Sequence, residues 1–243
     1  MKSIRLDKFL ADSQLGTRSE VRQLLKKGLV SVNGEMVKKP EFKIDPASDR
    51  VCFDGKEVSS QQEVYYMLNK PAGVVSATRD NHDRTVLDLL PPGDRRPDLF
   101  PVGRLDKDTT GLLLITNDGA LSHRLLSPRR HVDKTYFVRV NGRIREETVE
   151  AFRKGIDIGD EKRTLPAELE VLPEETDASG NKIYRANLTI SEGRFHQVKR
   201  MFEKVGCNVT YLKRLALGNL TLDNLKPGEY RKLTESEIEA LHK

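Results

Sequence analysis

The sequence predicts an α+β protein made of two parts, a small N-terminal α/β module and a larger second domain. Helix and strand patterns fill the first 58 residues and stop at a polar stretch, Ser59–Glu63. Beyond it, strand-like apolar runs and helical patterns alternate without a strict βαβ order. We therefore place a first domain at residues 1–58, a linker at 59–63 and a second domain at 64–243.

Composition narrows the class of protein. The chain has 243 residues, 33% charged and 37% hydrophobic, which suits a globular protein with a substantial core. No apolar run approaches the roughly 20 residues of a membrane span, and the N-terminus lacks the apolar stretch of a secretory signal. Neither Cys52 nor Cys207 has a Cys or His partner at metal-ligand spacing. We expect reduced thiols, a cytoplasmic location, no metal site and no membrane partner.

Positive charge gathers at the N-terminus. Residues 1–43 hold ten Lys/Arg and five Asp/Glu, so their net charge of +5 equals that of the whole chain. A basic module on a nearly neutral body is typical of nucleic-acid binding. A solvated face that merely keeps the protein soluble is the alternative. The small size and one-sided charge of the segment favour RNA.

Helix signals open the first domain. Apolar residues at helical spacing predict a helix over residues 6–13, ended by Gly16. Thr17 and Glu20 then form a capping-box pattern, which predicts the start of a second helix.

The second helix carries a basic face, and strands follow it. Arg18, Arg22 and Lys26 recur every four residues and therefore share one side of the helix. Val30–Val37 predicts a hairpin whose central Asn-Gly pair is typical of a type I′ turn. Val51–Phe53 predicts a further strand.

The second domain mixes strands and helices. Its predicted strands lie at 64–68, 112–116, 134–140, 169–172 and 184–190. Its predicted helices lie at 121–126, at 146–154 before Gly155, at 198–205 before Gly206, and after a Thr234/Glu237 capping box. The stretch 80–98 is rich in Pro and Gly, and we expect a mobile or substrate-facing loop there.

One short run carries the strongest chemical signal. Gly103–Gly111 places Asp106 beside Arg104 in a glycine-bounded turn, directly before an aliphatic stretch. A carboxylate at the mouth of a buried strand can act as a nucleophile or a general acid/base, and a guanidinium beside it can keep it ionised. The alternative is a surface turn in which Asp106 and Asp108 cap backbone amides.

The same residues allow another enzymatic interpretation. Asp106–Thr110 fits Asp-x-Asp-x-Thr, the nucleophile motif of haloacid-dehalogenase-type phosphatases, which require Mg²⁺. That motif normally follows an aliphatic strand, whereas here the aliphatic run comes after it. The order of the two features therefore disfavours a phosphatase.

Four ordered blocks resemble the pseudouridine synthases. Gly103–Gly111, with Asn117–Gly119 behind it, resembles their catalytic motif and is most similar to the RsuA branch, which modifies small-subunit ribosomal RNA. Tyr65–Gly73, Lys134–Tyr136 and Glu192–Met201 resemble the family's other motifs in the same order. The resemblance implies a catalytic domain built on a largely antiparallel mixed sheet with flanking helices, and a reaction without a cofactor.

The first domain resembles the S4 RNA-binding module. Arg5–Lys8 and Thr17–Ser19 match its signature positions. The resemblance implies that basic side chains of this domain contact phosphates, which supply affinity but little sequence information. The residues we expect to bind RNA are Arg5, Lys8, Arg18, Arg22 and Lys26.

The family resemblance implies four catalytic residues. Asp106 attacks or stabilises C1′ of a uridine, or takes a proton from C2′; the sequence leaves these routes open. Tyr136 holds the detached uracil and relays a proton. Lys199 forms a buried ion pair that keeps Asp106 ionised. Arg104 helps to extrude the target nucleotide from its helix.

Three further residues complete the expected site. The resemblance implies that Leu217 packs under the uracil and that Arg194 binds substrate. His196, beside Gln197, invites assignment as a general base, but the family motif indicates a structural role.

The predicted activity is isomerisation of a uridine to pseudouridine in ribosomal RNA. We expect 16S rRNA of the small subunit, within a partly assembled particle, as the substrate of a monomeric enzyme. A large-subunit (23S) rRNA enzyme of the same branch is one alternative. A non-catalytic RNA-binding assembly factor is another, although it would not need Asp106, Tyr136 and Lys199 together.

Overall fold

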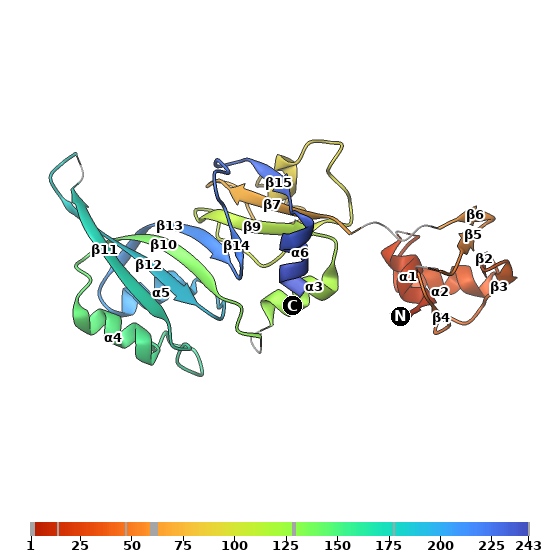
Figure 1. Ribbon diagram of the computed structural model, residues 1–243, viewed down its shortest axis with the longest axis horizontal. Helices are drawn as coiled ribbons and strands as arrows, with labels where there is room; N and C mark the ends of the chain where they lie inside the picture. Colours follow the sequence, from red (N-terminus) through yellow and green to blue (C-terminus); the bar gives the residue numbers. More distant parts are fainter. Residues whose placement is uncertain are drawn as a thin grey trace. The chain divides into compact units, whose positions relative to one another are not determined.

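The computed structural model describes residues 3–13, 15–46, 48–58, 63–127, 130–176 and 178–242. The chain divides into two compact units, Met1–Glu63 and Val64–Lys243 (Figure 1). Apart from Glu63, the predicted linker lies outside the described residues, so the linker and the exact domain bounds stay predictions.

The N-terminal unit packs two helices against short strands. The helices are α1 (Leu6–Asp12) and α2 (Arg18–Lys26). Strands β1 (Ile4–Arg5) and β4 (Lys43–Ile44) form a pair, and a four-stranded sheet has the order β3 (Glu35–Met36), β2 (Val30–Val32), β5 (Val51–Phe53), β6 (Lys56–Glu57). Aliphatic residues of both helices and of the strands form one core between them.

Local signals in this unit are confirmed, with one difference. The Thr17 hydroxyl accepts a hydrogen bond from the Glu20 amide, and Glu20 accepts one from the Thr17 amide, as a capping box requires. Asn33 and Gly34 have φ of 52° and 86°, the left-handed pair of a type I′ turn. The first helix ends at Asp12, before the predicted stop at Gly16.

The second unit is built on a mixed sheet with the order β11-β12-β10-β13-β9-β7-β15, with β14 beside β13 and β8 beside β9 (Figure 1). Within the described residues, the neighbouring strands of this sheet are antiparallel, except that β13 and β9 are parallel. This agrees with the predicted, largely antiparallel mixed sheet. The strands are β7 (Tyr65–Lys70), β8 (Phe100–Pro101), β9 (Thr110–Thr116), β10 (Lys134–Asn141), β11 (Glu168–Thr176), β12 (Lys182–Ile190), β13 (Asn208–Leu217), β14 (Leu220–Thr221) and β15 (Tyr230–Lys232).

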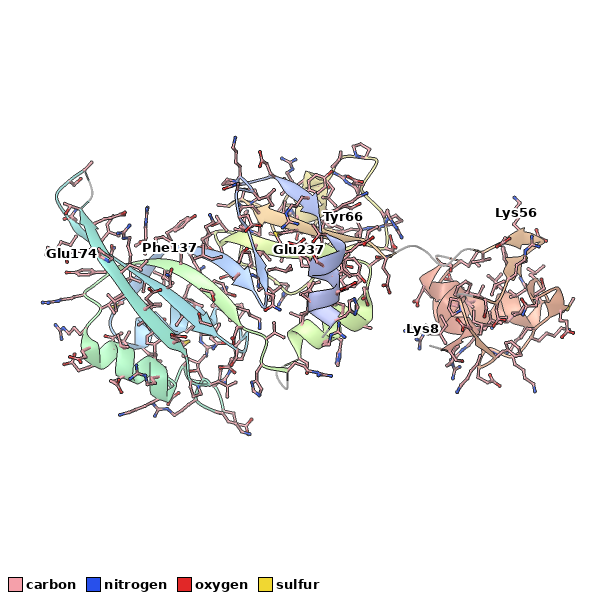
Figure 2. The ribbon with its side chains drawn as sticks, viewed as in Figure 1. Lys8, Lys56, Tyr66, Phe137, Glu174 and Glu237 are labelled. Atoms are coloured by element: carbon pink, nitrogen blue, oxygen red, sulfur yellow. The ribbon has the colours of Figure 1, made fainter. Side chains whose placement is uncertain are left out.

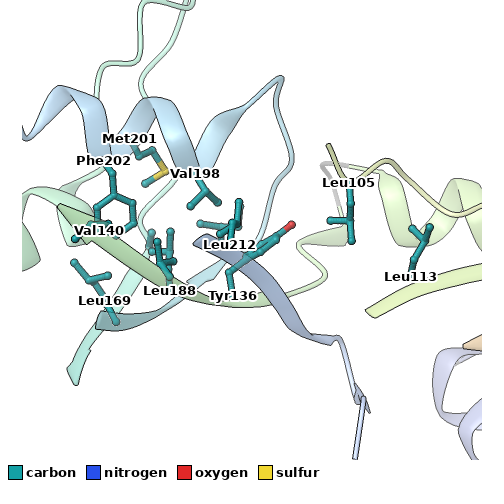
Figure 3. Packing of buried hydrophobic residues seen from close by; sticks show 14 of the residues in the cluster. Leu105, Leu113, Tyr136, Val140, Leu169, Leu188, Val198, Met201, Phe202 and Leu212 are labelled. Atoms are coloured by element: carbon teal, nitrogen blue, oxygen red, sulfur yellow. The ribbon is translucent and has the colours of Figure 1, made fainter. Parts of the chain in front are cut away.

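Helices cover the sheet and create two cores. The helices are η1 (Val86–Leu89), α3 (Gly119–Leu126), α4 (Glu146–Lys154), α5 (Gln197–Lys204) and α6 (Glu235–His242). The ring centroids of Phe152 on α4 and Phe202 on α5 lie 4.9 Å apart, with the planes tilted by 51°, in a core that includes Val86 of η1 (Phe202 is labelled in Figure 3). Helices α3 and α6 close a second core on β7 and β9. No helix in the described ranges is long and apolar enough to cross a membrane.

The two halves of the sheet meet at the parallel pairing of β13 with β9. Arg214 lies opposite Gly111, and its Nε donates a 2.7 Å hydrogen bond to the Leu112 carbonyl. Gly111 has φ of +105°, and a Cβ there would lie 2.2 Å from the Arg214 oxygen. Glycine is required at this position because the backbones touch.

Two features of the second domain go beyond the sequence patterns. The ten-residue strand β13 is not predicted by them, because the buried Arg214 interrupts the apolar alternation that identifies a strand. The 80–98 stretch contains the short helix η1, whose Val86 is buried in the core. Asp94 also accepts hydrogen bonds from the hydroxyls of Tyr66 (3.2 Å; Figure 2) and Tyr230 (2.6 Å).

Candidate active site

Asp106 lies on the segment between β8 and β9, and buried polar side chains hold its backbone. The Ser76 hydroxyl donates to the Leu105 carbonyl at 2.9 Å and accepts from the Leu105 amide at 3.1 Å. The Leu105 side chain is buried in the core. The residue that precedes the carboxylate is thus fixed on both sides, which preorganises the turn.

Lys70 also holds the backbone of this turn through hydrogen bonds. Its side chain is fully buried, and Nζ donates to the carbonyls of Thr109 (2.8 Å), Asp106 (3.0 Å) and Lys107 (3.3 Å). Burial lowers the pKa of Lys70 to about 8, and the nearby carboxylates of Asp108 and Asp106 oppose this shift. The turn is therefore wrapped around a cation, which no local sequence signal predicted.

Lys199 bridges the carboxylates of Asp106 and Asp108. Lys199 Nζ lies 3.1 Å from Asp106 Oδ2 and 2.7 Å from Asp108 Oδ1. Burial opposes the charge on Lys199, but hydrogen bonds to the two carboxylates outweigh it and raise the pKa of Lys199. The same lysine lowers the pKa of Asp108. Asp106 and Asp108 therefore share the Lys199 cation, and a backbone hydrogen bond also helps to lower the pKa of Asp108.

The predicted buried ion pair needs correction in two respects. The side chains of Lys199 and Asp106 are 28% and 29% exposed, so the pair is partly open to solvent. The lysine also makes its shorter contact with Asp108, which the sequence did not assign to it. Both side chains of the pair line a cavity.

A cavity of about 530 Å³ lies beside this carboxylate, within the range of small-ligand sites. Tyr136 on β10 is 8% exposed and lines it with Leu212 of β13. Figure 3 shows the Tyr136 ring beside Leu212, with its hydroxyl directed toward the segment that carries Leu105. Apolar side chains and the Asp106 carboxylate therefore line the same cavity.

Leu217 does not occupy its predicted place. It is 1% exposed and packs in the core under α3 and α6. Leu212, five residues earlier on the same strand, lines the cavity instead. A register shift between Thr135 and Tyr136 separates the two positions, and a local apolar pattern carries no sign of such a shift.

The structure shows different contacts for Arg194 and Arg104, the two arginines predicted in the site. The Arg194 guanidinium donates to the carbonyls of Lys162 (2.6 Å) and Arg163 (2.8 Å) and to Glu192 (3.0 Å), so it braces a neighbouring loop, and Arg194 also lines the cavity. Arg104 lines the cavity, is exposed, and makes no ion pair with the described residues. The Arg104 guanidinium is thus available to a ligand.

Sequence reasoning gave His196 only a structural role, yet the structure brings it into the site. Its Nε2 lies 3.4 Å from Asp106 Oδ1. The backbone of His196 is left-handed, with φ of 48°, at the entrance to α5. A sequence pattern cannot show this contact because it depends on the docking of α5 against the β8–β9 turn.

The five predicted RNA-binding residues are all exposed on the N-terminal unit (Lys8 is labelled in Figure 2). Two of them also have an internal partner. Asp7 is buried, accepts two 2.9 Å hydrogen bonds from Arg5 and lies 3.6 Å from Arg22. The hydrogen bonds from Arg5 lower the pKa of Asp7. Lys8, Arg18 and Lys26 make no ion pair with the described residues.

Comparison with known proteins agrees with this geometry. The family described as RNA pseudouridylate synthase matches residues 64–204, and the S4 domain matches residues 4–51. The chain belongs to the RNA pseudouridylate synthase family. It is therefore an RNA uridine isomerase, and the phosphatase interpretation of Asp106–Thr110 is excluded.

Full-length relatives support the same assignment. The chain is 47% identical to the Bacillus subtilis (strain 168) protein named "Uncharacterized RNA pseudouridine synthase YtzG", over 98% of both chains. It is 46% identical to the Escherichia coli (strain K12) "Ribosomal small subunit pseudouridine synthase A", over 97% of this chain and 98% of that one. A solved structure titled "Crystal structure of pseudouridylate synthase" is 40% identical, with a TM-score of 0.69 and coverage of 98% and 99%.

Proposed function

We propose that this pseudouridine synthase acts on a uridine of small-subunit (16S) ribosomal RNA, with Asp106 as its catalytic carboxylate. The observation that carries the proposal is the Asp106 carboxylate, held 3.1 Å from Lys199 at the edge of the cavity that Tyr136 lines. The small-subunit target rests on relatives of that name, 44–46% identical over nearly the whole chain.

The reaction breaks the N1–C1′ bond of uridine, turns the uracil and joins C5 to C1′. The proton on C5 leaves at the end and N1 gains a proton, so no atoms or electrons are gained or lost overall. A carboxylate is suited to the first step because it can attack C1′ or remove the proton from C2′. The hydrogen-bonded turn around Ser76 and Lys70 keeps Asp106 in place while the base moves.

The neighbours of Asp106 have complementary roles in this proposal. Lys199 orients the Asp106 carboxylate, and the partial exposure of the ion pair lets the sugar approach it. Tyr136 stacks on the uracil and relays the C5 proton, while Leu212 packs against the base. Arg104, exposed at the cavity, supports extrusion of the target nucleotide.

RNA affinity is assigned to the N-terminal unit. We place this RNA-binding domain at residues 1–58, joined by a linker at 59–63 to the catalytic domain at 64–243. Lys8, Arg18 and Lys26 contact phosphates, and Arg5 and Arg22 do so while holding the buried Asp7. The protein works in the cytoplasm as a monomer, on rRNA within a partly assembled small subunit.

Tritium release from [5-³H]uridine-labelled 16S rRNA tests the proposal, on free RNA and on partly assembled particles. Wild type should release tritium, and Asp106→Asn should reduce release below detection while RNA affinity changes by less than threefold. Asp108→Asn is the matched variant, because it makes the same change beside the same lysine, and it should retain at least a tenth of the activity. Release only from 23S rRNA would refute the target, and full activity of Asp106→Asn would refute the catalytic role.

A further inference from the structure

Phe195 is an unusually exposed aromatic residue at the edge of the active site. Its side chain is 71% exposed, the highest value among the large hydrophobic residues of the described ranges. It lines the same cavity as Asp106 and Tyr136. An exposed aromatic ring beside a ligand cavity indicates a surface that a partner covers.

The exposed ring is nevertheless firmly positioned. Phe195 stacks on His196, with ring centroids 3.8 Å apart and planes 20° apart. Arg200 donates from Nη1 to the Phe195 carbonyl at 3.1 Å, and its amide donates to the His196 carbonyl at 3.0 Å. Gln197 accepts a 2.9 Å hydrogen bond from the Arg194 amide on the other side. Little conformational entropy is therefore left to lose when a ligand covers the ring.

The stacked pair of Phe195 and His196 lies next to the Asp106 carboxylate. His196 Nε2 lies 3.4 Å from Asp106 Oδ1, and Phe195 covers the imidazole ring. One face of Phe195 is thus occupied, and its exposure leaves the rest of the ring open to a ligand. Arg104, which makes no ion pair within the described part of the chain, adds a positive charge at the same cavity that suits an RNA backbone.

We propose that Phe195, backed by His196, is a stacking platform for a nucleobase of the substrate strand next to the target uridine. The inference rests on the proposed function, since it requires RNA with a uridine at the cavity. Extrusion of the target leaves its neighbours partly unstacked, and an aromatic ring replaces the lost stacking. Because every base has a π-face, the platform fixes the strand without reading its sequence.

Binding and turnover of Phe195 variants test the platform. Phe195→Ala should weaken binding of 16S rRNA, measured in the inactive Asp106→Asn background, by about 5- to 150-fold, the range that stacking free energies of about 1–3 kcal/mol correspond to. Phe195→Trp should retain wild-type affinity, and Phe195→Leu should recover only part of it. Val171→Ala removes another exposed apolar side chain, 46% exposed on β11, and should bind as wild type does.

Two further readouts separate stacking from a structural role. The slope of log affinity against log salt should be unchanged in Phe195→Ala, because no phosphate contact is lost. After the target uridine is mapped with wild-type enzyme, 2-aminopurine is placed in the RNA on its 5′ or its 3′ side. Fluorescence at one of these positions should be lower in the Asp106→Asn complex than in the Asp106→Asn/Phe195→Ala complex.

The platform and the proposed function fail in different ways. If wild type releases tritium while Phe195→Ala binds and turns over normally, the platform is wrong and the function stands, and the exposed ring is then a protein-docking surface. Equal 2-aminopurine fluorescence in both complexes at both positions also overturns the platform. If wild type releases no tritium from any rRNA, the function itself is wrong.

Discussion

Replacing Gly111 by alanine tests whether the junction of the two half-sheets holds the site together. Gly111 has φ of +105°, which costs a non-glycine residue about 1–2 kcal/mol. The added Cβ would lie 2.2 Å from the Arg214 oxygen, whereas real Cβ contacts are essentially never under 3.0 Å, so strand β13 must move by roughly 0.8 Å. Overpacking of this kind costs about 1–3 kcal/mol, which gives a loss of about 2–5 kcal/mol in the free energy of unfolding.

Gly180→Ala is the matched control. Gly180 has φ of +85°, but a Cβ there would meet no atom within 4 Å, so this variant carries only the backbone cost. All six tyrosines lie between residues 65 and 230 and the chain has no tryptophan, so tyrosine fluorescence in urea follows the second unit alone. With a slope of about 2 kcal/mol per molar urea, Gly111→Ala should unfold about 0.5–1.5 M before Gly180→Ala.

The same displacement should reach the chemistry. Asp106 belongs to the β9 side of the junction, while Tyr136 and Lys199 belong to the β13 side. A shift close to 1 Å between reacting groups reduces turnover by about 100-fold. If the free energies of unfolding of Gly111→Ala and Gly180→Ala differ by less than 0.5 kcal/mol and Gly111→Ala keeps its turnover, the close contact between β9 and β13 does not hold the site together.

Three further changes test separate features. Lys70→Met should leave the carbonyls around Asp106 without a donor and lower turnover at least tenfold. Lys70→Arg should not restore turnover, because the Lys70 side chain is fully buried. Tritium release measures the turnover of both variants. Hydrogen bonds from Arg231 lower the pKa of Glu237 to about 2, so Glu237 contributes stability that is complete above its unfolded pKa of 4.5 and is lost as the pH falls through about 2. After allowance for solvent screening, Glu237→Gln should therefore cost about 2 kcal/mol at pH 7 and less than half of that at pH 3 in urea titrations, and an equal cost at both pH values would contradict the ion pair. Replacing Arg18 and Lys26 by alanine should reduce the salt slope of RNA binding by about 2 without changing thermal stability, and an unchanged slope would place the RNA elsewhere.

Local patterns in the sequence predicted most elements of the fold and several residues of the site. Helix α4 has the predicted bounds, and strand β10 extends one residue beyond its prediction, because amphipathic periodicity is a property of neighbouring residues. The Gly103–Gly111 run identified Asp106 for the same reason, since the turn and the strand after it are contiguous in the chain. The structure places Asp106, Tyr136 and Lys199 around one cavity.

Contacts between distant segments could not be predicted in this way. Lys70 lies 36 residues before Asp106 and reaches its carbonyl only because β7 pairs with β9. Leu212 belongs to the core that α5 covers and Leu217 to the core that α3 and α6 cover, and only the packing of these helices on the sheet distinguishes the two leucines.

The sequence by itself determined the α-helices and many of the strands, the helix caps and turns, the basic N-terminal face and the turn that carries Asp106, because each of these depends on residues a few positions apart. Only the tertiary structure decided which side chains share that carboxylate, which leucine faces the cavity and which aromatic ring stays uncovered beside it. Those outcomes depend on strand register and helix docking, and both are fixed by packing between segments that are far apart in the chain.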